Sequence, residues 1–332
     1  MNQLNLNDPN IQKTLREVFY PYATKKIDSM RRNSTRFVHY TSAENALNII
    51  DGNQVWLRNT NLMNDFREVQ HGQRCVLDAW NDDKVGGKLQ KALNSLSAGL
   101  SERFIQRFVG YERTRSHETY MIAVSEHGNE QNREDLYGRL SMWRAYGGST
   151  NVAFVFKNDP FLSESDALNA YTSPVLYADS EGFKPHFLEV AKNFEDHTDM
   201  LRLAGEDLTS YLLLSAFHFA VLSTKHPGFA EEREWRVIYT PNFYLTASRA
   251  SRLESKIVCL GGIPQRIYSL KLENVPEHGF LGATLPELLV EVIIGPTQFP
   301  WPIYDALVEK LMNANVEDAD KKVKVSNIPL RR

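Results

Sequence analysis

The stretch that most constrains the fold is residues 36–72, in which strand and helix signals alternate over a short distance. An apolar run opened by Phe37 and Val38 ends in the polar sequence H-Y-T at 39–41, which predicts a strand that meets a loop. Residues 55–57, V-W-L, predict a second short strand. One helix fits between these strands and another follows them, so the chain is expected to build a sheet with helices packed on it.

The helix between the two strands has its own start and stop signals. Thr41 and Glu44 have the spacing of a capping box, in which the hydroxyl accepts a hydrogen bond from a free amide and the carboxylate reaches back. Apolar residues at i, i+3, i+4 and i+7 from Ala43 form one face, and Gly52 supplies the left-handed residue that ends the helix. After the second strand, Asp65 is a suitable N-cap for the next helix.

The sequence H-Y-T-S-A-E-N-A-L-N-I-I-D-G-N, residues 39–53, resembles the opening strand and helix of ADP-ribosyltransferases. In that fold a His, one further residue and a Thr or Ser precede a helix with spaced apolar positions and a Gly. The resemblance implies that NAD is a substrate and that the side chain of His39 forms a hydrogen bond with its ribose, beside the nicotinamide. It also implies that the neighbouring backbone holds the carboxamide.

The chain as a whole is also similar to an uncharacterised bacterial family of unknown function. Five motifs carry this similarity: H-Y-T-S at 39–42, M-N-D-F-x-E at 63–68, M-W-R-A-Y-G at 142–147, E-x-E-W-R at 232–236 and I-I-G-P at 293–296. The similarity covers most of residues 36–331 but brings no assigned chemistry.

Residues 232–239, E-R-E-W-R-V-I-Y, predict a strand with an unusual charge pattern. Alternation along a strand places Glu232, Glu234 and Arg236 on one face. One interpretation is a charge ladder at a sheet edge, in which Arg236 offsets the repulsion between the two carboxylates. The other follows from the resemblance, because E-W-R-V-I-Y resembles the strand that carries the catalytic Glu of ADP-ribosyltransferases, and Glu232 completes the E-x-E spacing of some of them.

The resemblance therefore implies a site built from separate parts of the chain. The expected catalytic residues are Glu234, His39 and Glu232, and we expect His39 and Glu234 on adjacent central strands, with side chains that open into the same cleft. The expected NAD-binding residues are His39, Tyr40, Thr41, Asn64, Asp65, Phe66 and Tyr146. Tyr40 and Tyr146 are alternative rings for stacking on the nicotinamide, because Phe66 stands where the family commonly has a Tyr. Asn64 and Asp65 end a short loop and are expected at the rim of the cleft.

Composition excludes several other classes of protein. The 332 residues are 42% hydrophobic and 11% aromatic, enough for a sizeable core, and a formal net charge of -3 gives no overall positive field for nucleic acid. Cys75 and Cys259 fit neither a disulfide framework nor a zinc site, and the histidines have no H-E-x-x-H spacing, so no metal is expected. No run of about 18 apolar residues and no signal-peptide pattern occurs, so we expect no membrane span and a cytoplasmic location.

The rest of the chain predicts an α+β fold with one large domain. Residues 1–35 form an N-terminal lead-in with one amphipathic helix at 11–20. By the resemblance, residues 36–332 form a single ADP-ribosyltransferase-like domain with a mixed or antiparallel sheet and flanking helices. The apolar run at 152–156 predicts a central strand covered on both faces, and the apolar spacing over 88–108 predicts one long helix.

The resemblance implies an NAD-dependent ADP-ribosyltransferase-like enzyme that transfers ADP-ribose to an acceptor, a protein or a nucleic acid. By analogy with free-standing members of that fold, its role is that of a toxin or a phage-defence effector. The alternative is a non-catalytic module that keeps a degenerate cleft and binds a nucleotide or a peptide. The two hypotheses differ in whether His39 and Glu234 face one pocket.

Overall fold

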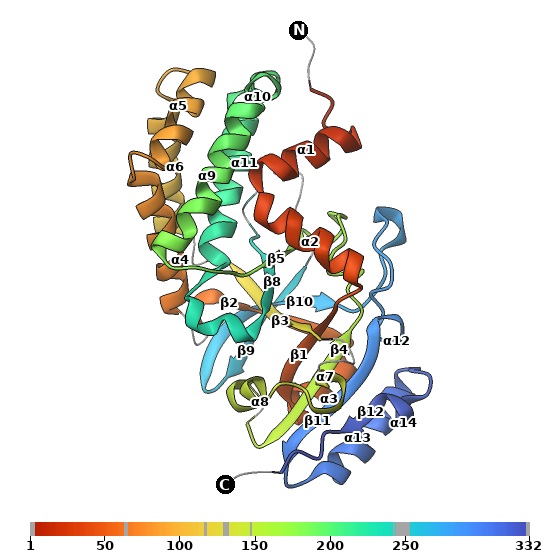
Figure 1. The fold of residues 1–332 in the computed structure, drawn as a ribbon. Helices are drawn as coiled ribbons and strands as arrows, with labels where there is room; N and C mark the ends of the chain where they lie inside the picture. The colour runs from red at the N-terminus through yellow and green to blue at the C-terminus, as the bar shows by residue number, and fades with distance from the viewer. Residues whose placement is uncertain are drawn as a thin grey trace.

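The computed structural model describes residues 4–62, 66–115, 118–128, 133–146, 148–241, 243 and 253–329. Its fold is mixed α/β, with one large and mostly antiparallel sheet (Figure 1). The strands pair in the order β12-β11-β4-β1-β3-β2-β10-β9, while β8 pairs with β3 and β5 pairs with β8. These strands are β1 (Arg36–Ser42), β2 (Gln54–Asn59), β3 (Tyr120–His127), β4 (Thr150–Phe156), β5 (Ala170–Pro174), β8 (Glu234–Tyr239), β9 (Glu254–Leu260), β10 (Ile263–Lys271), β11 (Leu289–Thr297) and β12 (Val323–Val325). A separate parallel pair joins β6 (Leu176–Tyr177) to β7 (Thr224–Lys225).

The helices form two groups in Figure 1, one beside strand β2 and one near the C-terminus. The first group and the N-terminal helices comprise α1 (Pro9–Phe19), α2 (Pro21–Asn33), α4 (Phe66–Asn81), α5 (Gly86–Leu96), α6 (Leu100–Arg115), α9 (Ser180–Asp196), α10 (Thr198–Ala204) and α11 (Glu206–Leu222). The others are α3 (Ala43–Gly52), α7 (Glu134–Tyr137), α8 (Leu140–Tyr146), α12 (Leu285–Leu288), α13 (Pro300–Asn313) and α14 (Ala319–Lys322), and a 3-10 helix, η4 (Pro227–Glu232), precedes β8. No helix in the described part of the chain combines the length and apolar character needed to cross a membrane.

β3 is the strand at which the sheet divides. It pairs with β8 from Tyr120 to Ser125 on one edge. On its other edge it pairs with β1 through residues 125–127 and with β2 through Tyr120 and Met121. Residues 122–124 of β3 therefore lie between the two pairings, and β1 and β2 separate beside them.

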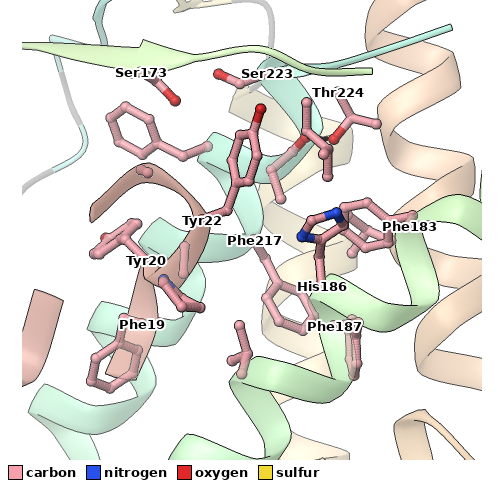
Figure 2. A pocket seen from close by; sticks show the side chains of 18 of the residues that line it. Phe19, Tyr20, Tyr22, Ser173, Phe183, His186, Phe187, Phe217, Ser223 and Thr224 are labelled. Atoms are coloured by element: carbon pink, nitrogen blue, oxygen red, sulfur yellow. Dashed lines mark hydrogen bonds between the residues drawn. The ribbon is translucent and has the colours of Figure 1, made fainter. Parts of the chain in front are cut away.

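The largest apolar core lies among the helices of the first group. Aromatic rings pack edge to face within it, with Phe217 contacting Trp80 and Phe104 at ring-centroid distances of 5.9 and 5.1 Å. The N-terminal lead-in joins this core through Phe19, which is buried against α9. Figure 2 shows the small cavity of about 110 Å³ where α1 and α2 meet α9 and α11, with Tyr22 edge-on to a histidine ring.

The sheet has apolar cores on both faces of β4. Phe154 and Phe156 pack against α3, β11 and α13, while Ala153 and Val155 pack on the opposite face with α8. The prediction of a central strand at 152–156, covered on both faces, is confirmed. A continuous apolar run could identify this strand because neither face meets water.

Two predicted helix signals are displaced by one residue. Ser42, not Thr41, is the N-cap of α3, and its hydroxyl accepts a hydrogen bond from the amide of Asn45 at 3.2 Å. Thr41 is still a strand residue and pairs with β4. At the other end Asn53 has the left-handed conformation, with φ of 46°, and Gly52 is the last helical residue.

Two predicted helical regions contain more elements than the sequence pattern indicates. The single helix predicted over 88–108 is wrong, since α5 and α6 are separate and Gly99 between them has φ of 70°. The lead-in contains a second helix, α2, which begins with Pro21 at its first position, where the missing amide hydrogen costs nothing.

Candidate functional site

A cavity opens where β1 and β2 separate along β3. Its volume is about 380 Å³, within the roughly 300–1,000 Å³ typical of ligand sites. Its walls come from β1, β2, β3, α3 and α8 and from charged side chains on four further elements, α4, β7, η4 and β8. The lining residues that bear on chemistry are His39, Tyr40, Thr41, Asn45, Asn48, Glu68, Tyr146, Lys225, Glu232, Glu234 and Arg236.

His39 lies where the pairing of β1 with β3 ends. The last paired residues are Val38 and Ser125, and just beyond them Nδ1 of His39 lies 3.0 Å from the carbonyl oxygen of Ala123. Because a carbonyl oxygen only accepts, Nδ1 carries the proton and donates it. Burial lowers the pKa of His39 and outweighs this hydrogen bond, so the ring is neutral at pH 7 and Nε2 is a hydrogen-bond acceptor.

The prediction that His39 and Glu234 lie on adjacent strands is wrong, because β3 lies between β1 and β8. Val38, Ser125 and Glu234 are register partners across these three strands, so their side chains share one face of the sheet. His39 is the next residue along β1 and its side chain belongs to the other face. Both residues line the same cavity, because at the gap its walls include residues of both faces.

Glu232 does not lie on the strand that the alternation predicts. It is the last residue of η4, and Arg233, with φ of 46°, separates it from β8, which begins at Glu234. Lys225 on β7 brings the two carboxylates together, with its Nζ 2.7 Å from Oε2 of Glu232 and 3.2 Å from Oε2 of Glu234. The interpretation as a ladder at a sheet edge is also wrong, because β8 is buried between β3 and β5.

Five side chains form a charged cluster at one wall of the cavity: Glu68, Lys225, Glu232, Glu234 and Arg236. Nε of Arg236 donates to Oε1 of Glu234 at 2.7 Å, and its Nη2 donates to Glu68. Nζ of Lys225 lies 2.5 Å from Oε1 of Glu68, which α4 supplies. Three carboxylates face two cations, so the cluster has a formal charge of minus one.

The pKa shifts in the charged cluster follow from burial and ion pairing. Burial alone would raise the pKa of Glu234, which is 7% exposed, but Arg236 and Lys225 outweigh it and the pKa lies below its ordinary value. Glu234 is therefore a carboxylate at neutral pH. For Glu68, burial outweighs the attraction of the same two cations, and its pKa is raised.

The two candidate aromatic rings differ in how they meet the cavity. Tyr40 is buried; its ring packs edge-on against Trp143 at 4.7 Å, and its hydroxyl accepts a hydrogen bond from the amide of Arg139 at 2.9 Å. Tyr146 ends α8 and is 42% exposed. The accessible ring at the cavity wall is therefore Tyr146, while Tyr40 positions the start of α8.

The remaining predicted site residues stand as follows. Asn64 and Asp65 lie outside the described residues, and α4 begins at Phe66, of which only the backbone is described. Thr41 is buried in β1 at the cavity wall. Lys225 is a lining residue that the sequence did not indicate; its one local signal is the helix-breaking H-P-G that follows it.

The fold and the cavity define a mixed α/β protein with a divided, mostly antiparallel sheet and a charged ligand-sized site at the division. Residues 142–237 match the sequence model of a family described as protein of unknown function, DUF2971. This segment includes most of α8, all of β4 and all the members of the charged cluster except Glu68. No curated protein and no solved structure matches the chain.

Proposed function

We propose that this chain is an NAD-dependent ADP-ribosyltransferase whose NAD site is the cavity between β1 and β2. The observation that carries the proposal is that His39, Glu232 and Glu234, residues from distant parts of the sequence, line this one cavity. The accessible ring of Tyr146 and the size of the cavity add support, since a nucleotide site needs both an aromatic surface and room.

In the proposed reaction the bond between ribose C1′ and the nicotinamide nitrogen breaks. Nicotinamide leaves as a neutral molecule with the bonding electrons, and positive charge develops on the ribose. A carboxylate that is already fixed in place stabilises this charge without reorganisation. Glu234 supplies the fixed carboxylate, held by Arg236, and the acceptor atom then bonds to C1′ and releases its proton to water.

The other residues have binding roles in this proposal. Nε2 of His39 accepts a hydrogen bond from a ribose hydroxyl, since its Nδ1 proton is engaged with Ala123. Tyr146 stacks on the nicotinamide ring, and Glu232, the less enclosed carboxylate of the pair, orients a ribose hydroxyl. The acceptor is a protein or a nucleic acid, and by analogy of fold the role is that of a toxin or phage-defence effector in the cytoplasm.

The test is incubation of the full chain with NAD labelled in its adenylate part and a bacterial lysate, followed by separate digestion with protease and nuclease. The digestion that removes the label from the macromolecular fraction identifies the acceptor class. Glu234→Gln is expected to lower nicotinamide release by about a hundredfold or more, with NAD affinity within severalfold of wild type.

The matched control is Glu112→Gln, which neutralises an equally buried carboxylate away from the cavity, paired with His218 at 2.8 Å. It should leave nicotinamide release unchanged. If only Glu232→Gln abolishes release, the roles within the pair are reversed. If neither variant changes a measurable release, the proposal is wrong.

A second candidate function is a non-catalytic module that binds a nucleotide in the same cavity. The observation in its favour is that both carboxylate oxygens of Glu234 already contact cations, Oε1 with Arg236 and Oε2 with Lys225. These contacts weaken the electrostatic stabilisation that Glu234 can give to positive charge on a bound ribose. For such a module, calorimetry detects binding of NAD or a related nucleotide while no nicotinamide is released over hours.

A further inference from the structure

A second buried group of polar side chains lies outside the cavity. His127 at the end of β3, Asp135 on α7 and Glu291 on β11 each place one nitrogen or carboxylate oxygen within 4.8 Å of the other two. The three residues come from separate elements, so no local spacing in the sequence indicates the group. We refer to them as the His127 triad.

Two atoms of the His127 triad have no hydrogen-bond partner within the part of the chain that the structure describes: Nδ1 of His127 and Oε1 of Glu291. Their residues are 1% and 6% exposed. Nε2 of His127 lies 2.7 Å from Oδ1 of Asp135. The contact with a carboxylate places the ring proton on Nε2, so Nδ1 carries a lone pair.

Leaving a buried acceptor unmatched costs roughly 1–3 kcal/mol, and the His127 triad contains two such acceptors. Acceptors cannot satisfy one another, because neither carries a proton to donate. A cation held by the side chains of the triad gives their buried acceptors a partner. The ligand types, one imidazole nitrogen and carboxylate oxygens, are those that zinc accepts at about 2.0–2.2 Å.

We propose that the His127 triad binds one divalent transition-metal ion, zinc by preference, through one ring nitrogen of His127 and the carboxylates of Glu291 and Asp135. Tetrahedral bonds of about 2.1 Å place ligand atoms about 3.4 Å apart, so atoms within 4.8 Å close on the ion by side-chain movements of about an ångström.

Two cations already neutralise the carboxylates and compete with the metal. Arg36 donates to Oδ1 of Asp135 at 2.6 Å, and Lys324 on β12 pairs with Oε2 of Glu291. The side chain of Lys324 is 40% exposed, so its ammonium can turn into water when an ion takes its place. Metal binding therefore displaces Lys324 from Glu291, and removing that ammonium should strengthen binding.

The ion has a structural role in this arrangement. It joins β3, β11 and the short helix α7, and the chain from α7 runs directly into α8, which carries Tyr146 to the cavity wall. A site of this kind, with ligands enclosed by protein, stabilises the folded state because the unfolded chain has no preformed site.

The experiment uses the full chain with Cys259→Ser, which removes an exposed thiol that would bind zinc elsewhere. The protein is stripped with chelator, given zinc chloride and dialysed; bound zinc is then measured by elemental analysis, affinity by competition with a chromophoric chelator, and stability by thermal unfolding. We expect one zinc per chain and a higher melting temperature. His127→Gln should lower affinity by more than about a hundredfold, since loss of a ligand's hydrogen-bond partner alone costs about 10–100-fold.

Two further variants keep the test decisive if His127→Gln folds poorly. Lys324→Met should fold and bind zinc more tightly than the parent, by about tenfold, because it removes the competing ammonium. His218→Gln changes a buried His–Glu pair outside the triad, that of His218 with Glu112, and should leave the zinc stoichiometry unchanged. The proposal is overturned if the parent retains no zinc, or if Lys324→Met and His127→Gln bind zinc as the parent does.

Discussion

Arg236 is the residue on which the charged cluster depends most, and its replacement should cost far more stability than the replacement of its partner Glu234. Arg236 is 2% exposed and donates to Glu234, to Glu68 and to the carbonyl oxygen of Leu222 at the end of α11. It therefore ties β8, α4 and α11 together through one side chain.

The magnitudes follow from the formal charge of the cluster. Arg236→Gln changes it from minus one to minus two and leaves three buried carboxylates facing only Lys225, the situation for which a loss of about 3–5 kcal/mol is typical. Glu234→Gln changes it from minus one to zero and keeps an oxygen that can accept from Arg236. Its cost should be limited to weakened hydrogen bonds, about 1–2 kcal/mol.

The assay is urea unfolding followed by circular dichroism at pH 7, with the free energy of unfolding of each variant compared with wild type. We expect Arg236→Gln to unfold at a clearly lower urea concentration than Glu234→Gln. Equal losses, or a larger loss for Glu234→Gln, would refute the view that charge balance in this cluster governs its stability.

Three further predictions concern other parts of the chain. Gly72→Ala should destabilise the protein by about 1–3 kcal/mol, because a Cβ there would lie 2.1 Å from the carbonyl oxygen of Val221. Gly87→Ala should not destabilise it, because the space around Gly87 is open. Thermal unfolding of both variants checks this. The free energy of unfolding should fall as the pH drops below about 6.5, by up to about 1.4 kcal/mol per pH unit for each histidine of lowered pKa. The cause is that His39 is protonated in the unfolded chain at a pH at which the buried ring in the folded protein is still neutral. His39→Gln should reduce this slope in urea unfolding measured from pH 7 to pH 5. Finally, His39→Ala should weaken NAD binding as well as turnover, since its hydrogen bond to the ribose forms in the ground state too; calorimetry that finds unchanged affinity would exclude this role.

The sequence pattern predicts individual elements well where burial is one-sided or complete. The strand at 152–156 and the strand–helix–strand order after residue 36 are present, because their apolar spacing reports directly which faces avoid water. The errors at the ends of α3 have a local cause: both Thr41 and Ser42 can cap a helix, and pairing with β4 holds Thr41 in the strand. The capping propensities of Thr41 and Ser42 alone therefore do not indicate which of the two is the N-cap.

The candidate site is less accessible to such reasoning, because long-range pairing determines it. Nothing in the local pattern indicates that β3 pairs with β1, β2 and β8 at once, or that Lys225 reaches two carboxylates. Arg233 illustrates the limit: its left-handed backbone removes Glu232 from the strand, although arginine is not a residue that signals such a turn. The alternation therefore predicts the strand positions of Glu234 and Arg236 correctly and the position of Glu232 wrongly.

The contact between His39 and Ala123 bears on why β1 and β3 separate beside the cavity. In a continuous antiparallel pair, a backbone amide of β1 would be the next group to bond the carbonyl of Ala123; here an imidazole takes that carbonyl. The backbone pairing of β1 with β3 cannot continue while the imidazole of His39 occupies this carbonyl, and the two strands diverge by about the width of a side chain. His39 thus acts as a spacer between two strands of the sheet, and the cavity beside it depends on the residue at position 39.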